Sequence, residues 1–113
     1  MDFTTARQFV VKQALPATEQ SNTFLQQLQQ HQAPIPGQVT SLLLALKALF
    51  EGLRSARQLD RELVYALFLL AHESRRAFDA GKQAGIEWPP LLDEDLSRIT
   101  SAVTSIFADQ WQS

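Results

Sequence analysis

The sequence predicts an all-α protein, a compact bundle of about five helices of which three are long and two short. Along three segments, apolar residues recur at alternating spacings of four and three, which is the pattern of one helix face. Proline and most glycines fall between the segments, where they are typical of turns and helix ends. Neither feature suits a half-buried strand, in which apolar and polar residues alternate. The 113 residues are expected to form one helical domain, 1–113.

The two short helices are expected near the N-terminus, over residues 4–14 and 22–31. Thr5 and Gln8 have the spacing of a capping box at the start of the first helix. Ser21 is expected to cap the second. Helices of this length do not persist alone in water, so both must dock on the longer helices.

A core helix is predicted over residues 38–54, where apolar residues form two adjoining stripes. The stripes comprise Val39, Leu42, Leu43, Ala45, Leu46, Leu49, Phe50, Gly52 and Leu53. Such a wide apolar arc requires neighbouring helices on two sides. The opposite side is polar apart from Leu44, which interrupts the row between Thr40 and Lys47.

The longest helix is predicted over residues 59–80, with Asp60 near its start and Arg75 near its end, as the helix dipole favours. Either Gly81 or Gly85 is expected to end it. One apolar stripe comprises Leu63, Leu67, Leu70, Ser74 and Ala77, and the next comprises Val64, Phe68, Ala71 and Phe78. The opposite row comprises Glu62, Tyr65, Leu69, His72, Arg76 and Asp79.

The last helix is predicted over residues 91–109, after Trp88-Pro89-Pro90, because proline suits a first helical turn. The acidic run 93–95 then places negative charge at the positive end of the helix dipole. The expected core stripe comprises Leu92, Leu96, Ile99, Val103 and Ile106, with Phe107 and Trp111 beside it. Val, Ile and Thr are frequent here and would also allow a strand, but the spacing favours a helix.

Residues that could support catalysis or bind a cofactor or metal are few. The chain has no cysteine, which excludes disulfides, thiolate metal sites and cysteine nucleophiles. Its four glycines cannot form a phosphate-binding loop. His72-Glu73 resembles the start of a zinc-binding H-E-x-x-H motif, but Arg76 stands where the second histidine would be. We therefore predict no catalytic, cofactor-binding or metal-ligating residue and favour a protein that is not an enzyme.

A nucleic-acid-binding regulator of the helix-turn-helix kind is an alternative. Arg54, Arg57 and Arg61 cluster between the third and fourth segments, and Arg75, Arg76 and Lys82 lie towards the end of the fourth. Acidic residues are interleaved with these cations, however, and the net charge of the chain is -2. Nucleic-acid binding normally requires a basic patch, so we do not favour this interpretation.

No segment has the length of a membrane span. The longest uninterrupted apolar run, residues 63–71, has nine residues, whereas a bilayer span needs about 20. At the N-terminus, Asp2 replaces the positive charge with which a secretory signal begins. The expected location is therefore the cytoplasm, without membrane contact.

Apolar and aromatic residues in otherwise polar rows predict a surface that binds another protein. Tyrosine and arginine are common anchors of such interfaces, and a Trp before two prolines is a rigid apolar feature. The candidate surface comprises Leu44, Tyr65, Leu69, His72, Arg76 and Trp88. Two alternatives remain open: the short N-terminal helices could cover these rows, and Trp88 could anchor the core. The preferred hypothesis is a small adaptor, regulator or assembly factor that also forms a homodimer.

Two stretches, PIPGQVTSLLLALKALFEGL (34–53) and LDRELVYALFLLAHESRRAFDAGKQAGIEWPPLLDEDLSRI (59–99), resemble a family of small cyanobacterial proteins of about this length. The resemblance covers most of the chain and implies a cyanobacterial cytosol. It carries over no functional residue, because the family has no established activity. Some members are labelled dethiobiotin synthetase, a label that implies ATP-dependent carboxylation. An ATP-dependent enzyme of the biotin pathway is therefore a second alternative.

Overall fold

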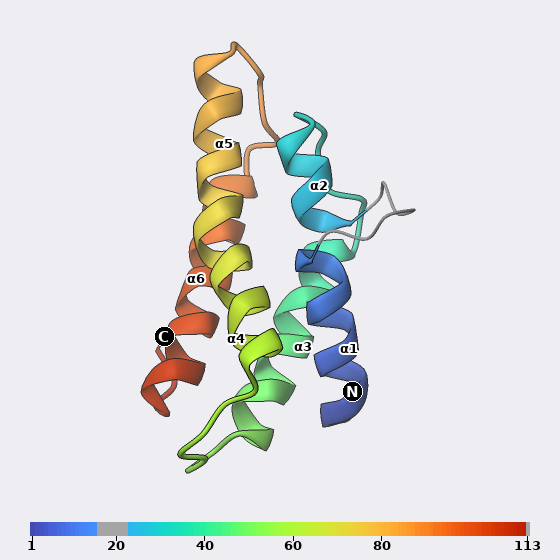
Figure 1. Cartoon of the computed structure of the whole chain (residues 1–113). Coiled ribbons are helices and arrows are strands. Elements are labelled where there is room, and N and C mark those ends of the chain that lie inside the picture. The colour runs from blue at the N-terminus through green and yellow to red at the C-terminus, as the bar shows by residue number, and fades with distance from the viewer. Residues whose placement is uncertain (16–22, 113) are drawn as a thin grey trace.

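Over residues 1–15 and 23–112, which the structure describes, the computed structural model consists of five helices and contains no strand (Figure 1). The all-α prediction is therefore confirmed. The two short helices are α1(Phe3–Ala14) and α2(Phe24–Gln29). The long ones are α3(Gln38–Gly52), a continuous rod made of α4(Arg61–Phe68), η1(Leu69–Glu73) and α5(Ser74–Gln83), and α6(Leu92–Ala108). None of these described helices is both long and apolar enough to span a bilayer.

The rod contains one π-helical turn, η1, at its centre. There the backbone N–H of Ser74 donates to the carbonyl of Leu69, five residues earlier, instead of four. The buried Ser74 hydroxyl donates to the carbonyl of Leu70, so this polar side chain is satisfied inside the core. The buried stripe predicted for this helix continues through the turn from Leu63 to Ala77.

The core lies between the rod and the helices that surround it (Figure 1). The α1 helix packs on α3 and α4, α2 packs on α5, and α3 packs on α6. This arrangement buries the short helices against the long ones, as the sequence requires. The largest fully buried apolar side chains are Val10, Phe24, Leu28, Leu42, Leu46, Leu49, Leu63, Leu67, Leu70, Leu96 and Ile99.

The first helix begins earlier than its predicted capping box. Asp2 is the N-cap of α1, and its carboxylate accepts a hydrogen bond from the backbone N–H of Thr5 at 2.7 Å. The Thr5–Gln8 prediction is therefore wrong, because an aspartate three positions upstream supplies the cap. In α2 the cap is Thr23, whose hydroxyl accepts from the N–H of Gln26. Ser21, the cap predicted from the sequence, lies outside the described residues.

Gly85, and not Gly81, ends the rod. Gly85 has a φ of 88°, a left-handed conformation that a residue without Cβ adopts readily. Its N–H donates to the carbonyl of Lys82, and the N–H of Ile86 donates to that of Gly81, which together form a Schellman motif. Gly81 has a different role inside α5, where a Cβ would lie 2.5 Å from the indole ring of Trp88.

These contacts predict opposite effects for two Gly→Ala substitutions inside helices. Alanine is normally the better helix former by about 1 kcal/mol. At Gly52 the nearest obstacle is the ring of Phe3, which is partly exposed and can move aside, so Gly52→Ala should be neutral or stabilising. Gly81→Ala must displace Trp88 and should destabilise the fold by about 1–3 kcal/mol. Urea unfolding of both variants tests this, and equal stabilities would contradict it.

The end of α6 departs from the sequence prediction. Phe107 and Trp111, predicted beside the core stripe, are 48% and 41% exposed. The interior positions near them are filled by the smaller Ala102 and Ser105. Asp109 adopts a left-handed conformation after the helix, and its carboxylate accepts from the backbone N–H of Ser55 at 3.1 Å. The end of α6 is thereby joined to the end of α3. The prolines precede the first turn of α6 and do not form part of it.

Candidate interaction surface

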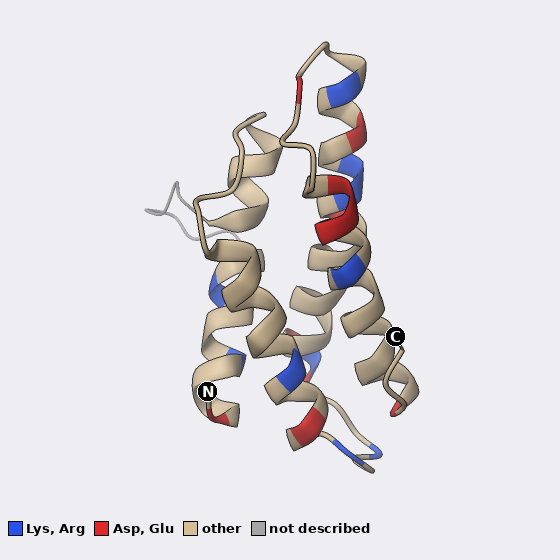
Figure 2. Cartoon of the chain, turned by 180° about the vertical axis from the view of Figure 1, so that it is seen from behind, with Lys and Arg blue, Asp and Glu red and all other residues tan. Residues whose placement is uncertain are grey.

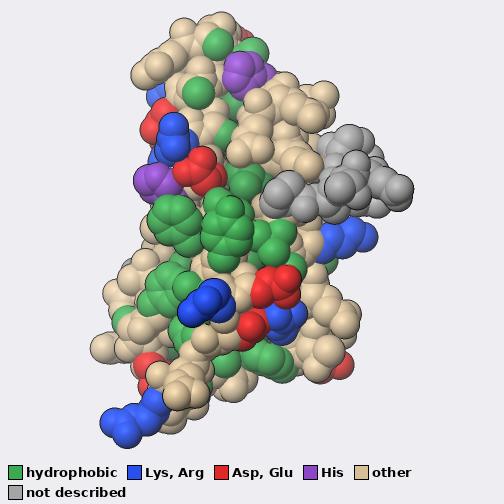
Figure 3. Space-filling model, in the orientation of Figure 1, with side chains coloured by type: hydrophobic (Ala, Val, Ile, Leu, Met, Phe, Trp, Pro, Cys, Tyr) green, Lys and Arg blue, Asp and Glu red, His purple; other side chains and the backbone are tan. Residues whose placement is uncertain are grey.

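Two aromatic side chains and a leucine lie together on the outside of the rod. Tyr65 is 54% exposed and Phe68 is 49% exposed, and Leu69 beside them is half-buried. His72 and Arg76 follow on the same side and are exposed. We call these five residues the outer face. Figure 3 shows apolar side chains gathered at the middle of this side of the molecule, with a histidine and charged side chains beside them.

Phe68, which the sequence places on the second apolar stripe of this helix, is 49% exposed and does not belong to the core. The angular position of Phe68 lies on the flank of the helix, between the buried stripe and the outer row. The α6 helix packs against η1 and α5, further along the rod, and Phe68 remains half exposed. The aromatic ring therefore extends the outer face instead of the core. A helical wheel places Phe68 next to Tyr65 and His72, at the edge of its stripe, where the packing of neighbouring helices decides between burial and exposure.

Ring stacking and polar contacts within the rod hold His72 and Arg76 of the outer face in place. The ring of His72 stacks on that of Phe68, with centroids 5.0 Å apart. Its Nε2 lies 3.5 Å from the carboxylate of Glu73, which also accepts from the Arg76 guanidinium at 3.4 Å. The Glu73–Arg76 pair agrees with the helical spacing of the two residues. Because Arg76 has five N–H donors, this bond leaves it able to contact a further carboxylate.

A hollow of about 370 Å³ lies beside the outer face, between the rod and the short helices. Tyr65, Phe68 and Leu69 form one wall, and Leu25 and Ala14 contribute to the other. The short helices thus border the outer face and leave its aromatic side chains half exposed. The surface combines projecting aromatic rings with an adjacent recess, a shape that suits the insertion of a partner's side chain.

Leu44 belongs to a different surface. It is 59% exposed and lines a groove of about 510 Å³ between α3 and α6, together with Leu43, Lys47 and Ala102. Trp111 closes one end, and the Lys47 ammonium lies 3.9 Å from the centroid of its ring. Figure 2 shows α3 and α6 from this side. The sequence pattern did not predict this groove. Trp111 lies beyond the end of α6, and its contact with Lys47 of α3 is a tertiary contact that helical periodicity does not indicate.

Trp88 packs within the molecule. Its indole N–H donates to the carbonyl of Phe78 at 2.9 Å, and its ring stacks on that of Phe78 with centroids 5.9 Å apart. The half-buried ring also lies against Gly81. These contacts correspond to the core-anchoring alternative. The six residues predicted as one surface are therefore divided among the outer face, the groove between α3 and α6, and this internal contact.

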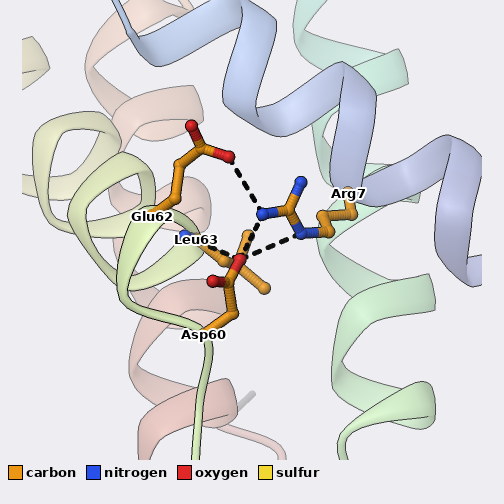
Figure 4. Close-up of polar contacts among 4 residues, drawn as sticks. All are labelled: Arg7, Asp60, Glu62 and Leu63. Atoms are coloured by element: carbon orange, nitrogen blue, oxygen red, sulfur yellow. Dashed lines mark hydrogen bonds and ion pairs between the residues drawn. The ribbon is translucent and has the colours of Figure 1, made fainter.

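An ion-pair cluster joins the start of the rod to α1. The guanidinium of Arg7 donates to the carboxylates of Asp60 and Glu62 (Figure 4). Asp60 is also the N-cap of α4, where it accepts from the N–H of Leu63 at 3.4 Å. The hydrogen bond from Arg7 holds the pKa of Asp60 below its usual value and raises the pKa of Arg7.

The lowered pKa of Asp60 predicts that stability depends on pH in the acid range. A carboxyl whose pKa is lower in the folded state stabilises the fold above its unfolded pKa of about 3.9, and this contribution is lost as the pH falls further. Asp60→Asn keeps a capping side chain but removes the charge. The variant should have a slightly lower Tm at pH 7, and the difference should shrink as the pH falls below about 3.9. A difference in Tm that does not change as the pH is lowered would contradict this assignment.

Three of the five arginines considered for nucleic-acid binding, Arg54, Arg75 and Arg76, are paired with carboxylates. The guanidinium of Arg54 contacts Asp109 at 3.0 Å, and that of Arg75 contacts Asp93 at 2.7 Å. Phosphate contacts would have to compete with these pairs. Among the described residues, no group of three or more His, Asp or Glu side chains could hold a metal ion.

Comparison with known proteins adds no relative. No family model, curated protein or solved structure matches the chain. The resemblance to the cyanobacterial family thus remains a prediction from the sequence.

Proposed function

We propose that this chain is a non-enzymatic interaction module that associates with a second copy of itself through the outer face. The observation that carries the proposal is the exposure of Tyr65 and Phe68, side by side with Leu69 at the centre of the longest helix. Aromatic anchors that are surrounded by polar groups are typical of the core of protein interfaces. A small adaptor, regulator or assembly factor in the cytosol would act through such a surface.

A self-associating surface must be complementary to itself, and the outer face has features that allow this. Its centre is apolar, so two copies bury apolar area without bringing like charges together. Its recess lies next to its projecting rings, so each copy offers both to the other. Its own Arg76 and the neighbouring Glu62 and Glu73 supply charges of both signs.

Light scattering of the unmodified chain after size exclusion tests the proposal. The monomer has a mass of 12.7 kDa. We expect a mass about twice this value at high protein concentration, falling towards the monomer on dilution, as for a homodimer in equilibrium with its subunits. A monomer mass over the whole concentration range would contradict the proposal.

A further inference from the structure

The groove between α3 and α6 ends at a wall that specific contacts hold in place. Trp111 forms this wall, and its ring lies edge-to-face against that of the buried Phe50, with centroids 5.2 Å apart. The next residue is also fixed, because the N–H of Gln112 donates to the hydroxyl of the buried Ser105 at 2.7 Å. The groove is therefore formed before any ligand binds, as is usual for small-molecule sites.

The half-buried side chain of Lys47 places its ammonium at this end of the groove, over the face of the Trp111 ring. Among the residues that the structure describes, no carboxylate forms an ion pair with Lys47. The other cation of the lining, Arg98, is paired with Glu94 and Asp95 of its own helix. None of the described residues that line the groove is acidic. Lys47 is therefore the cation that the groove offers to an anion.

From these observations we propose that the groove binds a free carboxylic acid with an unbranched acyl chain. The carboxylate contacts Lys47, and the chain lies against Leu43 and Leu44. The volume of about 510 Å³ is in the range of small-molecule sites. Along α3 the lining extends from Thr40 to Lys47, which is about 10 Å at the rise of a helix. An extended chain advances about 1.2 Å per bond, so an acyl chain of about eight to ten carbons fits this length.

The charge of the ligand and its apolar chain have separate roles. A carboxylate at Lys47 forms a charge-assisted hydrogen bond, which apolar surroundings strengthen. Burial of the chain against apolar side chains supplies the remaining affinity. A cationic amphiphile of the same length buries the same chain but places its charge against that of Lys47. This site is independent of the proposed self-association, because the groove and the outer face are different surfaces.

Calorimetric titration of the full chain with decanoate, below the concentration at which it forms micelles, tests the proposal. We expect saturable binding of about one decanoate per chain. Decylammonium, which has the same chain length and the opposite charge, should bind much more weakly. Lys47→Gln should weaken the binding of decanoate about tenfold, as expected for the loss of one charge-assisted hydrogen bond. Leu44→Glu should abolish it, because the new carboxylate lies in the groove and within helical reach of Lys47.

Lys82→Gln is the matched control for the lysine variant. The Lys82 ammonium also lies near an aromatic ring, 5.7 Å from the centroid of Phe78, but it belongs to α5 and does not line the groove. We expect its removal to leave the affinity for decanoate unchanged. The proposal is wrong if decanoate does not bind, or if the two lysine variants lose the same affinity. It is also wrong if decylammonium binds as well as decanoate, as it would in a groove that receives the apolar side chains of a protein partner.

Discussion

Replacing Phe68 with glutamate is expected to leave the chain folded and to abolish its self-association. Phe68 is 49% exposed, so its removal costs the core little. An aromatic anchor at the centre of an interface typically contributes about 2 kcal/mol or more. A symmetric dimer contains two copies of every contact, so the expected loss is about 4 kcal/mol, or roughly a thousandfold in the dissociation constant. Sedimentation equilibrium measures this change directly.

Leu44→Glu is the matched control for this experiment. Leu44 is exposed to a similar degree, at 59%, but it lies in the groove between α3 and α6 and not on the outer face. The same charge is introduced on another surface, so we expect an unchanged dissociation constant. If both substitutions weakened self-association equally, the effect would be a general one of charge, and the role of Phe68 would be contradicted. Leu69→Asp is less informative, because Leu69 also packs against the core.

The second large effect is expected from truncation of the core, at Leu46. This side chain is fully buried in α3, and Leu→Ala substitutions at such positions cost about 2–5 kcal/mol because they remove apolar contacts and leave a cavity. A domain of this size is stable by only about 5–15 kcal/mol. Leu46→Ala should therefore lower the Tm by about 10 °C or more.

Leu44→Ala provides the comparison within the same helix. Only two positions away, Leu44 projects into the groove, so its truncation should change the free energy of unfolding by less than about 0.5 kcal/mol. Urea unfolding of both variants measures the difference. A similar cost at the two positions would mean that the buried stripe of α3 has been assigned to the wrong side of the helix.

The helices could be predicted because apolar spacing reflects burial against several neighbours at once. Leu46, Leu67 and Ile99 lie on stripes that the sequence identified, and all three are fully buried. The caps were less predictable, because several residues near a helix start have side chains that can act as the N-cap. Asp2 caps α1, although Thr5 and Gln8 have the spacing of a capping box.

The surfaces could be predicted only in part, because exposure depends on which neighbour covers a flank. Tyr65 and His72 lie opposite the buried stripe of the rod and are exposed, because the short N-terminal helices, which the sequence left as a possible cover, do not bury them. Phe68 and Phe107 are apolar residues at the edge of a stripe, where only tertiary packing decides between burial and exposure. The groove lined by Leu44 depends on the return of Trp111 to α3, which no local pattern encodes.

Disulfide cross-linking at Leu69 tests most directly whether two copies meet at the outer face. The chain has no native cysteine, so a single Leu69→Cys substitution gives an unambiguous product. With oxidised glutathione as the acceptor of two electrons and two protons, the thiols of two copies that meet at the outer face should form a disulfide-linked dimer. Leu44→Cys at the same concentration should remain monomeric on a non-reducing gel. If Leu69→Cys stays monomeric, or forms dimers no faster than Leu44→Cys, the account of the outer face is contradicted.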